Sequence, residues 1–279
     1  MLRDASIEEK IKLKEWFPNL NVDQTVVSGE ETSAYNCIGW TIRAVGAWIW
    51  PGDTLELFDT FYGMCGFERA SSGPIAAWGI DGRDMKHGSV SGPHHGPRWE
   101  SKCGWSLRIQ HDLNELESPD SYGKVVAFYE RKKAPSESMI RAIEVVNEGR
   151  FAMPTNEQIA VVRAAAQGLP ANLRAQFEQA FAAWKATWSA PHVAISSNPR
   201  AVTYVREFQE LIALGPNIIP AIVEKLLEPD NFFALQLYDA LQRRHNLIVA
   251  LDLSSFEVFQ GEQGRARRTI ERFSNSLRR

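Results

Sequence analysis

Cys37 stands in a sequence context that could make a cysteine a nucleophile. It follows Tyr35-Asn36 and lies near the start of residues 36–48. These residues have helical composition and are closed by the turn signal Pro51-Gly52-Asp53. A thiol at a helix N-terminus faces unpaired N–H groups and the positive end of the helix dipole, which lower its pKa. The same N–H groups would hold an oxyanion formed on an attacked carbonyl. We therefore predict that Cys37 is a nucleophile.

A nucleophilic thiol needs a base within hydrogen-bond reach, and His87 is the candidate. His87 opens a predicted strand over residues 87–91. The next predicted strand, residues 98–102, offers Ser101 or Glu100 to orient the imidazole. Because side chains alternate between the two faces of a strand, only one of those two can point at the site.

The other cysteines and His111 have weaker claims to a catalytic role. His111 could orient or replace the base, could cap a helix that begins at Leu113, or could simply be exposed. Cys65 and Cys103 have no comparable context, and we expect both in the core. The spacing of the cysteines contains no CxxC pair, so no zinc site is expected. Thiol chemistry of this kind requires no metal and no cofactor.

These side chains need a helix and a sheet to bring them together. Seven of the nine tryptophans precede residue 106, whereas after residue 134 the sequence is rich in Ala, Leu, Gln, Glu and Arg. We predict an α+β domain over residues 1–134 and an all-α domain over residues 135–279. In the first domain, a second helix is expected over residues 55–63. Strands are expected over residues 75–80, 87–91, 98–102, 106–110 and 124–131.

The second part shows apolar residues at three- and four-residue spacing. Its helices are predicted over residues 136–147, 156–166, 173–187, 201–214, 218–227 and 232–246. The basic stretch at residues 265–279 is expected to form a solvated, partly frayed helix, with docking to a partner as the alternative.

Three segments resemble the NlpC-type cysteine peptidases and amidases, a circularly rearranged branch of the papain-like fold. Asn36-Cys37-Ile38-Gly39-Trp40 resembles the Asp-Cys-Ser-Gly-aromatic nucleophile helix of that family. His87-Gly88-Ser89-Val90 resembles its His-Val-Gly-Ile strand, and Trp99-Glu100-Ser101 falls where its third polar residue lies. The resemblance covers about residues 30–131 and keeps the order Cys, His, polar residue. It implies a papain-like domain, with the nucleophile helix packed on an antiparallel sheet.

The resemblance also implies a role for each matching residue. Cys37 carries over as the nucleophile, His87 as the base and Ser101 as the orienting residue. Tyr35 and Asn36 carry over to the oxyanion or substrate side, although Asn36 stands where the family has an acidic residue. Uncharacterised bacterial proteins share the segments YNCIGW, WPGD and W-x-SK-x-G, so the closest kin is expected to be an uncharacterised bacterial family.

Charge and hydropathy limit the partners. A formal net charge of -3, from 31 basic and 34 acidic residues, gives no overall attraction to nucleic acid. The charged start has no signal-peptide pattern, and no run of about 18 apolar residues occurs. We expect a protein that is cytoplasmic at synthesis and has no integral membrane segment; export by a route without a signal peptide stays open.

Two functions follow as hypotheses. The first is a thiol hydrolase that cleaves an amide or related acyl bond in a peptide, a protein or a cell-wall-type amide. The second is a catalytically inactive papain-like scaffold that acts as a binding or adaptor protein, with a protein partner on its helical domain.

Overall fold

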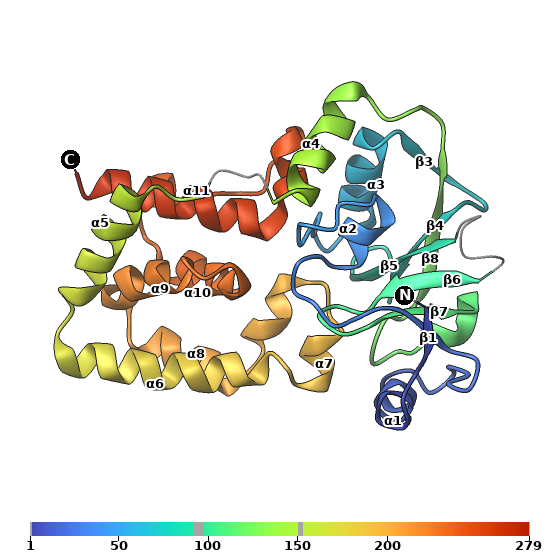
Figure 1. The fold of residues 1–279 in the computed structure, drawn as a ribbon, viewed down its shortest axis with the longest axis horizontal. Helices are drawn as coiled ribbons and strands as arrows, with labels where there is room; N and C mark the ends of the chain where they lie inside the picture. Colours follow the sequence, from blue (N-terminus) through green and yellow to red (C-terminus); the bar gives the residue numbers. More distant parts are fainter. Residues whose placement is uncertain (1, 92–97, 150–152, 279) are drawn as a thin grey trace.

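The computed structural model describes residues 2–91, 98–149 and 153–278 (Figure 1). The chain is a mixed α+β protein whose strands all lie in its first half and whose second half is helical. The strands are β1 Arg3–Asp4, β2 Val26–Gly29, β3 Phe67–Ala70, β4 Ile75–Gly79, β5 Met85–Ser91, β6 Trp99–Lys102, β7 Arg108–His111 and β8 Lys124–Arg131.

The strands form one eight-stranded sheet in the order β1-β2-β7-β6-β5-β4-β8-β3. Each pairing between these strands is antiparallel. The predicted α+β class and antiparallel sheet are therefore confirmed at this level. Strands β5 and β6 are paired at Val90↔Glu100 and Ser91↔Trp99, at one end of β5.

Helices cover both faces of the sheet. Helices α2 (Cys37–Thr41) and α3 (Leu55–Met64) lie on one face, and α1 (Ile7–Trp16) lies on the other (Figure 1). The first face buries α2 and α3 side chains against Ile75 and Ala77 of β4. The second buries α1 side chains against Ala76 and Trp78. Because successive side chains of β4 point into two different hydrophobic cores, the strand is apolar along its whole length.

Helix α2 is much shorter than predicted, because it ends at Thr41 rather than near residue 48. Arg43 adopts a left-handed conformation with φ 65°, which a continuing α-helix does not allow. The chain then folds back over Gly39, where an added Cβ would lie 2.7 Å from the carbonyl oxygens of Ala44 and Ala47. The lack of a side chain at Gly39 therefore makes room for this turn of the backbone.

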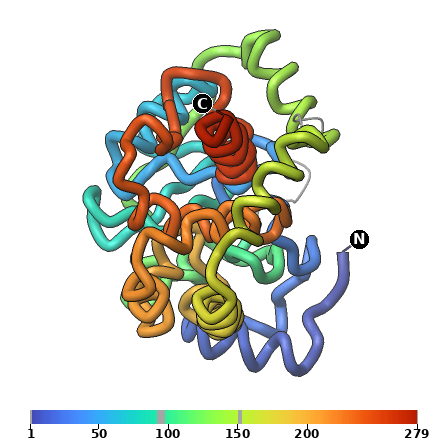
Figure 2. The backbone as a smooth tube through the Cα atoms, turned by 90° about the vertical axis from the view of Figure 1, so that its left-hand side faces the viewer, coloured from blue at the N-terminus to red at the C-terminus, as the bar shows by residue number. Residues whose placement is uncertain are grey.

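The helical part is a set of antiparallel and crossing helices. Its helices are α4 Glu137–Asn147, α5 Asn156–Gln167, α6 Ala171–Thr187, α7 Pro191–Ala194, α8 Arg206–Ala213, α9 Ile219–Lys225, α10 Ala234–Leu241 and α11 Gly261–Ser276. Helices α6 and α11 form two opposite edges with α9 and α10 between them, and Figure 2 shows both of these long helices end-on. Within the described residues, no helix combines the length and the apolar character needed to cross a membrane.

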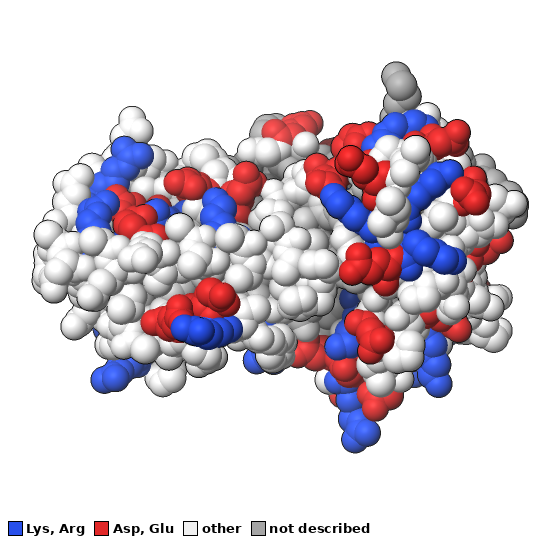
Figure 3. Space-filling model, turned by 90° about the horizontal axis from the view of Figure 1, so that it is seen from below, with Lys and Arg blue, Asp and Glu red and all other residues white. Residues whose placement is uncertain are grey.

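The two parts share their hydrophobic cores. Trp48, from the first part, is fully buried in the core of the helical part. Met139 and Val146 of α4, with Val258 and Phe259 near α11, are buried in the core that contains α2 and α3. The surface is mixed in charge, with Lys and Arg side chains lying among Asp and Glu on the face in Figure 3. The boundary predicted near residue 134 is thus crossed by packing in both directions.

Candidate functional site

Cys37 lies at the first residue of α2, as predicted. Asn36 caps the helix, because its side chain accepts a hydrogen bond from the Gly39 N–H at 3.1 Å. The thiol is fully buried, and burial raises its pKa to about 11, although the Ser197 hydroxyl and the Gly88 and Ile38 amides oppose the rise. The lowered pKa expected for this thiol is therefore not found, because desolvation outweighs the stabilisation by nearby donors.

A segment from the helical part covers Cys37. We call residues 194–200 the covering segment. The Cys37 N–H donates to the Ser197 hydroxyl at 3.4 Å. The Ser197 carbonyl accepts from Trp48 Nε1 at 2.9 Å and from Asn36 Nδ2 at 3.4 Å. Ser197 thus accepts hydrogen bonds from three donors that lie around the N-terminus of α2.

His87 lies in β5, next to the Gly88 amide that faces the thiol. Gly88 packs against Ile38 and Thr41, so the His87 side chain points toward the other face of the sheet. There the imidazole stacks on Tyr122, with ring centroids 3.9 Å apart.

The His87 ring is fully buried, and neither ring nitrogen has a hydrogen-bond partner among the described residues. Burial, with a smaller effect of His111, holds the pKa of His87 well below its ordinary value. The hydrogen bond expected between Cys37 and His87 is therefore not formed in this state.

Ser101 belongs to a different hydrogen-bonded chain. Its Oγ lies 2.7 Å from Ser89 Oγ and 2.8 Å from His111 Nε2. Trp78 Nε1 donates to Ser89 at 2.8 Å, and His111 Nδ1 lies 2.8 Å from the Asp112 carbonyl. Because a carbonyl only accepts, Nδ1 carries the proton, Nε2 accepts, and Ser101 donates to His111. Ser101 is thus bonded to His111, not to His87.

The remaining predicted residues serve the surrounding structure. Asn36 also donates to the Ile49 carbonyl at 2.6 Å and accepts from the Ile49 N–H at 3.1 Å. The Tyr35 hydroxyl accepts from Arg108 Nη1 at 3.1 Å, and burial raises the pKa of Tyr35. Glu100 is buried and pairs with Arg108 at 3.2 Å. Asn36 and Tyr35 therefore fix the shape of the chain beside Cys37.

Several residues of this region carry no signal in the local sequence. Ser197 is separated from Cys37 by 160 positions, and Tyr122 reads as part of a turn. Lys102 is fully buried and donates to the carbonyls of Gly104 and Ser106, both at 2.6 Å. Burial lowers its pKa to about 7. Only the folded arrangement shows that these residues surround Cys37.

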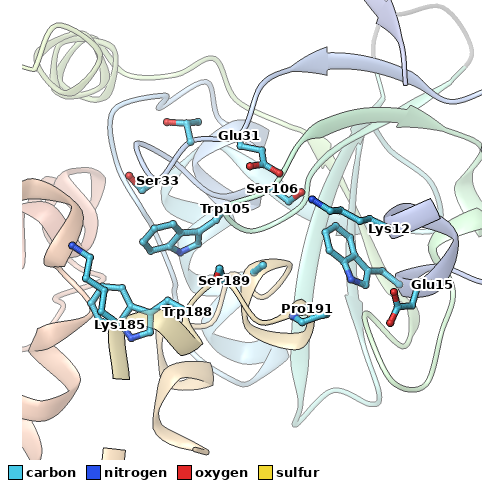
Figure 4. Close-up of a pocket in the computed structure, with 13 residues that line it drawn as sticks. Lys12, Glu15, Glu31, Ser33, Trp105, Ser106, Lys185, Trp188, Ser189 and Pro191 are labelled. Atoms are coloured by element: carbon cyan, nitrogen blue, oxygen red, sulfur yellow. The ribbon is translucent and has the colours of Figure 1, made fainter. Parts of the chain in front are cut away.

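A cavity of about 580 Å³ opens between the two parts of the chain (Figure 4). Lys12 and Glu15 of α1 lie at one end, Lys185 and Trp188 at the other, and Trp105 between them. Among residues 2–91, 98–149 and 153–278, no group of three or more His, Cys, Asp or Glu side chains is arranged to hold a metal ion.

Comparison with known proteins gives one family match. A family model described as a domain of unknown function (DUF7689) matches residues 26–130. No curated protein and no solved structure matches the chain. The matched range contains Cys37, His87 and Ser101 but ends before the covering segment.

Proposed function

We propose that this chain is a papain-like thiol hydrolase, held here in a closed state, that cleaves an amide or related acyl bond. The observation that carries the proposal is the set of donors that Ser197 occupies beside Cys37. The N–H of Cys37 donates to the Ser197 hydroxyl, and the side chains of Trp48 and Asn36 donate to the Ser197 carbonyl. Donors that converge beside a thiol are what an acyl-transfer site needs.

The unpaired imidazole of His87 is the second support. A buried polar group without a hydrogen bond costs about 1–3 kcal/mol, and such groups often have a catalytic role. His87 is next to Gly88 in β5, and the Gly88 amide faces the thiol of Cys37 in α2, so the β5 backbone beside the base borders the nucleophile. Formation of the dyad would require, besides departure of the covering segment, a local rearrangement of β5 that moves the His87 side chain from the Tyr122 face of the sheet to the face of Cys37.

The reaction would proceed in two acyl-transfer steps. The Cys37 thiol passes its proton to His87, and the sulfur bonds to the carbonyl carbon of the substrate. The proton then moves to the leaving nitrogen as the C–N bond breaks. Water splits the resulting thioester, with its hydroxyl going to the acyl group and its hydrogen to the sulfur. The substrate would be a peptide, a protein or a cell-wall-type amide.

Thiol labelling tests the dyad directly. The rate of Cys37 alkylation by iodoacetamide is measured by mass spectrometry from pH 6 to 10, in the wild type and in His87→Asn and His87→Ala. If His87 forms an ion pair with the thiolate whenever the site opens, both variants should lower the rate at pH 7 by about tenfold or more. Cys65 and Cys103 are also fully buried and serve as internal controls for unfolding.

Equal rates at pH 7 in the three proteins would contradict the dyad. If labelling supports the dyad, the wild type is next assayed for hydrolysis of a peptide-amide library. Cys37→Ala should show no hydrolysis in the same assay.

A binding protein is the second candidate, favoured by the cavity in Figure 4. Its volume falls within the usual range for small-molecule sites, and Trp16, Trp105 and Trp188 line it together with lysines and glutamates. A ligand with an aromatic ring and an acidic group would suit this lining. We expect such ligands to raise the Tm of the wild type, less so in Lys12→Ala. Lys10→Ala, on the same helix but outside the cavity, is the matched control, and equal shifts in both variants would contradict this site.

A further inference from the structure

We infer that the covering segment is a pseudosubstrate, and that the groove it fills recognises a peptide with a small residue over Cys37 and an arginine three positions later, in the turn that the covering segment adopts. The inference rests on the proposed function, since it names the substrate class of the same site. It depends on the path of residues 194–200 and on the side chains that hold them.

The covering segment is bound along its length by groups of the first part of the chain. The Trp105 N–H donates to the Ala194 carbonyl at 2.7 Å. The Tyr122 hydroxyl donates to the Ile195 carbonyl at 2.9 Å. The Ser197 carbonyl is held by Trp48 and Asn36 as described above. Carbonyl groups at positions 194, 195 and 197, which lie at the end of α7 and just after it, are thus bound irrespective of side-chain type.

Side-chain selectivity arises at two positions. Ser197 is fully buried against the Cys37 amide, so a large side chain there would have no room. Three residues later, the Arg200 guanidinium lies 3.1 Å from Asp53, which also accepts from Asn198 Nδ2 at 2.9 Å. Asp53 therefore makes polar contacts with two residues that follow Ser197 in the covering segment, Asn198 and Arg200.

The groove continues beyond the covering segment. Two hollows, of about 210 Å³ and about 730 Å³, border it. Asp53, Asn198 and Tyr204 line both hollows.

The lining of these hollows is acidic. Apart from Arg200 of the covering segment, five carboxylates and two basic side chains line them. They are Asp53, Asp84, Asp120, Asp239 and Glu262, with Lys86 and Arg265. The excess of negative charge favours a basic peptide over an acidic one.

Variants of the covering segment test whether it closes the site. Arg200→Ala and Ser197→Ala should each raise the rate of Cys37 alkylation about two- to fivefold, the range expected for losing one partly exposed ion pair or one hydrogen bond. Cys65 and Cys103 should keep their rates, because only local opening is favoured. Arg206→Ala is the matched control, since Arg206 pairs with Glu210 on the surface of α8. Unchanged Cys37 rates in both variants would overturn the inference.

A peptide added in trans tests the substrate class. A synthetic peptide with the sequence of residues 193–201, VAISSNPRA, should protect Cys37 of Arg200→Ala from alkylation. The same peptide with alanine in place of its arginine should protect at least about twofold less. Equal protection by the two peptides, or none by either, would overturn the assigned recognition. Faster alkylation and selective protection without hydrolysis would keep the groove and reject the hydrolase, so the two proposals fail separately.

Discussion

His111 ends a buried chain of hydrogen bonds in which every proton has a defined direction. Trp78 donates to Ser89, Ser89 to Ser101 and Ser101 to His111 Nε2, and the Nδ1–H bonds the Asp112 carbonyl. This chain requires a neutral imidazole, because a protonated Nε2 could no longer accept. Burial accordingly lowers the pKa of His111 to about 4.

The lowered pKa of His111 predicts loss of stability in mild acid. The unfolded chain binds this proton near pH 6.5, whereas the folded chain resists it until about pH 4. The free energy of unfolding should therefore fall as pH decreases across this interval, by about 3 kcal/mol from His111 alone. His111→Gln should show a smaller fall than the wild type in urea titrations between pH 7 and pH 4.

The exposed His245 provides the control, because His245→Gln should leave the pH dependence of the wild type unchanged. A wild-type slope in His111→Gln would show that this imidazole does not titrate in the predicted interval.

At the residue scale, the sequence predicted the element in which each site residue lies better than it predicted the side chains that each residue contacts. Cys37 begins a helix and His87 lies in a strand, as expected. The direction of the His87 ring could not be predicted, because it depends on which face of β5 meets α2. Ser101 lies on the neighbouring strand as expected, but its partner is His111, since both point to the α1 side. The role of Ser197 depends on tertiary folding alone.

At the element scale, local patterns predicted the elements whose signals are strong. Strand β8 has the predicted bounds, since KVVAFYER combines β-branched and aromatic residues after a turn. Strands β1, β2 and β3 were not predicted; with two to four residues they give little periodicity, although β6 and β7, of four residues each, were predicted. Helix α1 was not predicted because its sequence is strongly charged and has no apolar stripe, although Ser6 and Glu9 form a capping box there.

The C-terminal helix shows what local patterns leave out. The prediction of a solvated, partly frayed helix over residues 265–279 is wrong. Ile270 and Phe273 of α11 are buried in the helical core. Arg265 is buried too and forms ion pairs with Glu262, at 2.8 Å, and with Asp239. An arginine with two carboxylate partners can be buried, and the partner at position 239 is distant in sequence.

At the scale of the whole molecule, the two parts stabilise each other by exchanging side chains. Trp48 extends from the sheet part into the helical core and stands edge-on to Phe233, with ring centroids 5.3 Å apart. In return, Phe259 lies against Phe61 of α3 in the core beneath the sheet, with centroids 6.2 Å apart. Composition changes near residue 134, but such exchange cannot be read from composition. The burial of Cys37 beneath residues 194–200 is part of the same packing between the two parts of the chain.

Because Phe259 packs against α3, we predict that the stability of the sheet part depends on the helical part. Phe259→Ala removes a fully buried ring and should lower the free energy of unfolding by about 3–5 kcal/mol. Phe256→Ala is the matched control, because that side chain is 40% exposed and stacks on Phe259. In hydrogen exchange, the Phe259 variant should lose protection in α3, nearly two hundred residues earlier in the chain, whereas the control should keep it. Loss confined to α11 would instead mean that the sheet part keeps its core without the helical part, as two independent domains would.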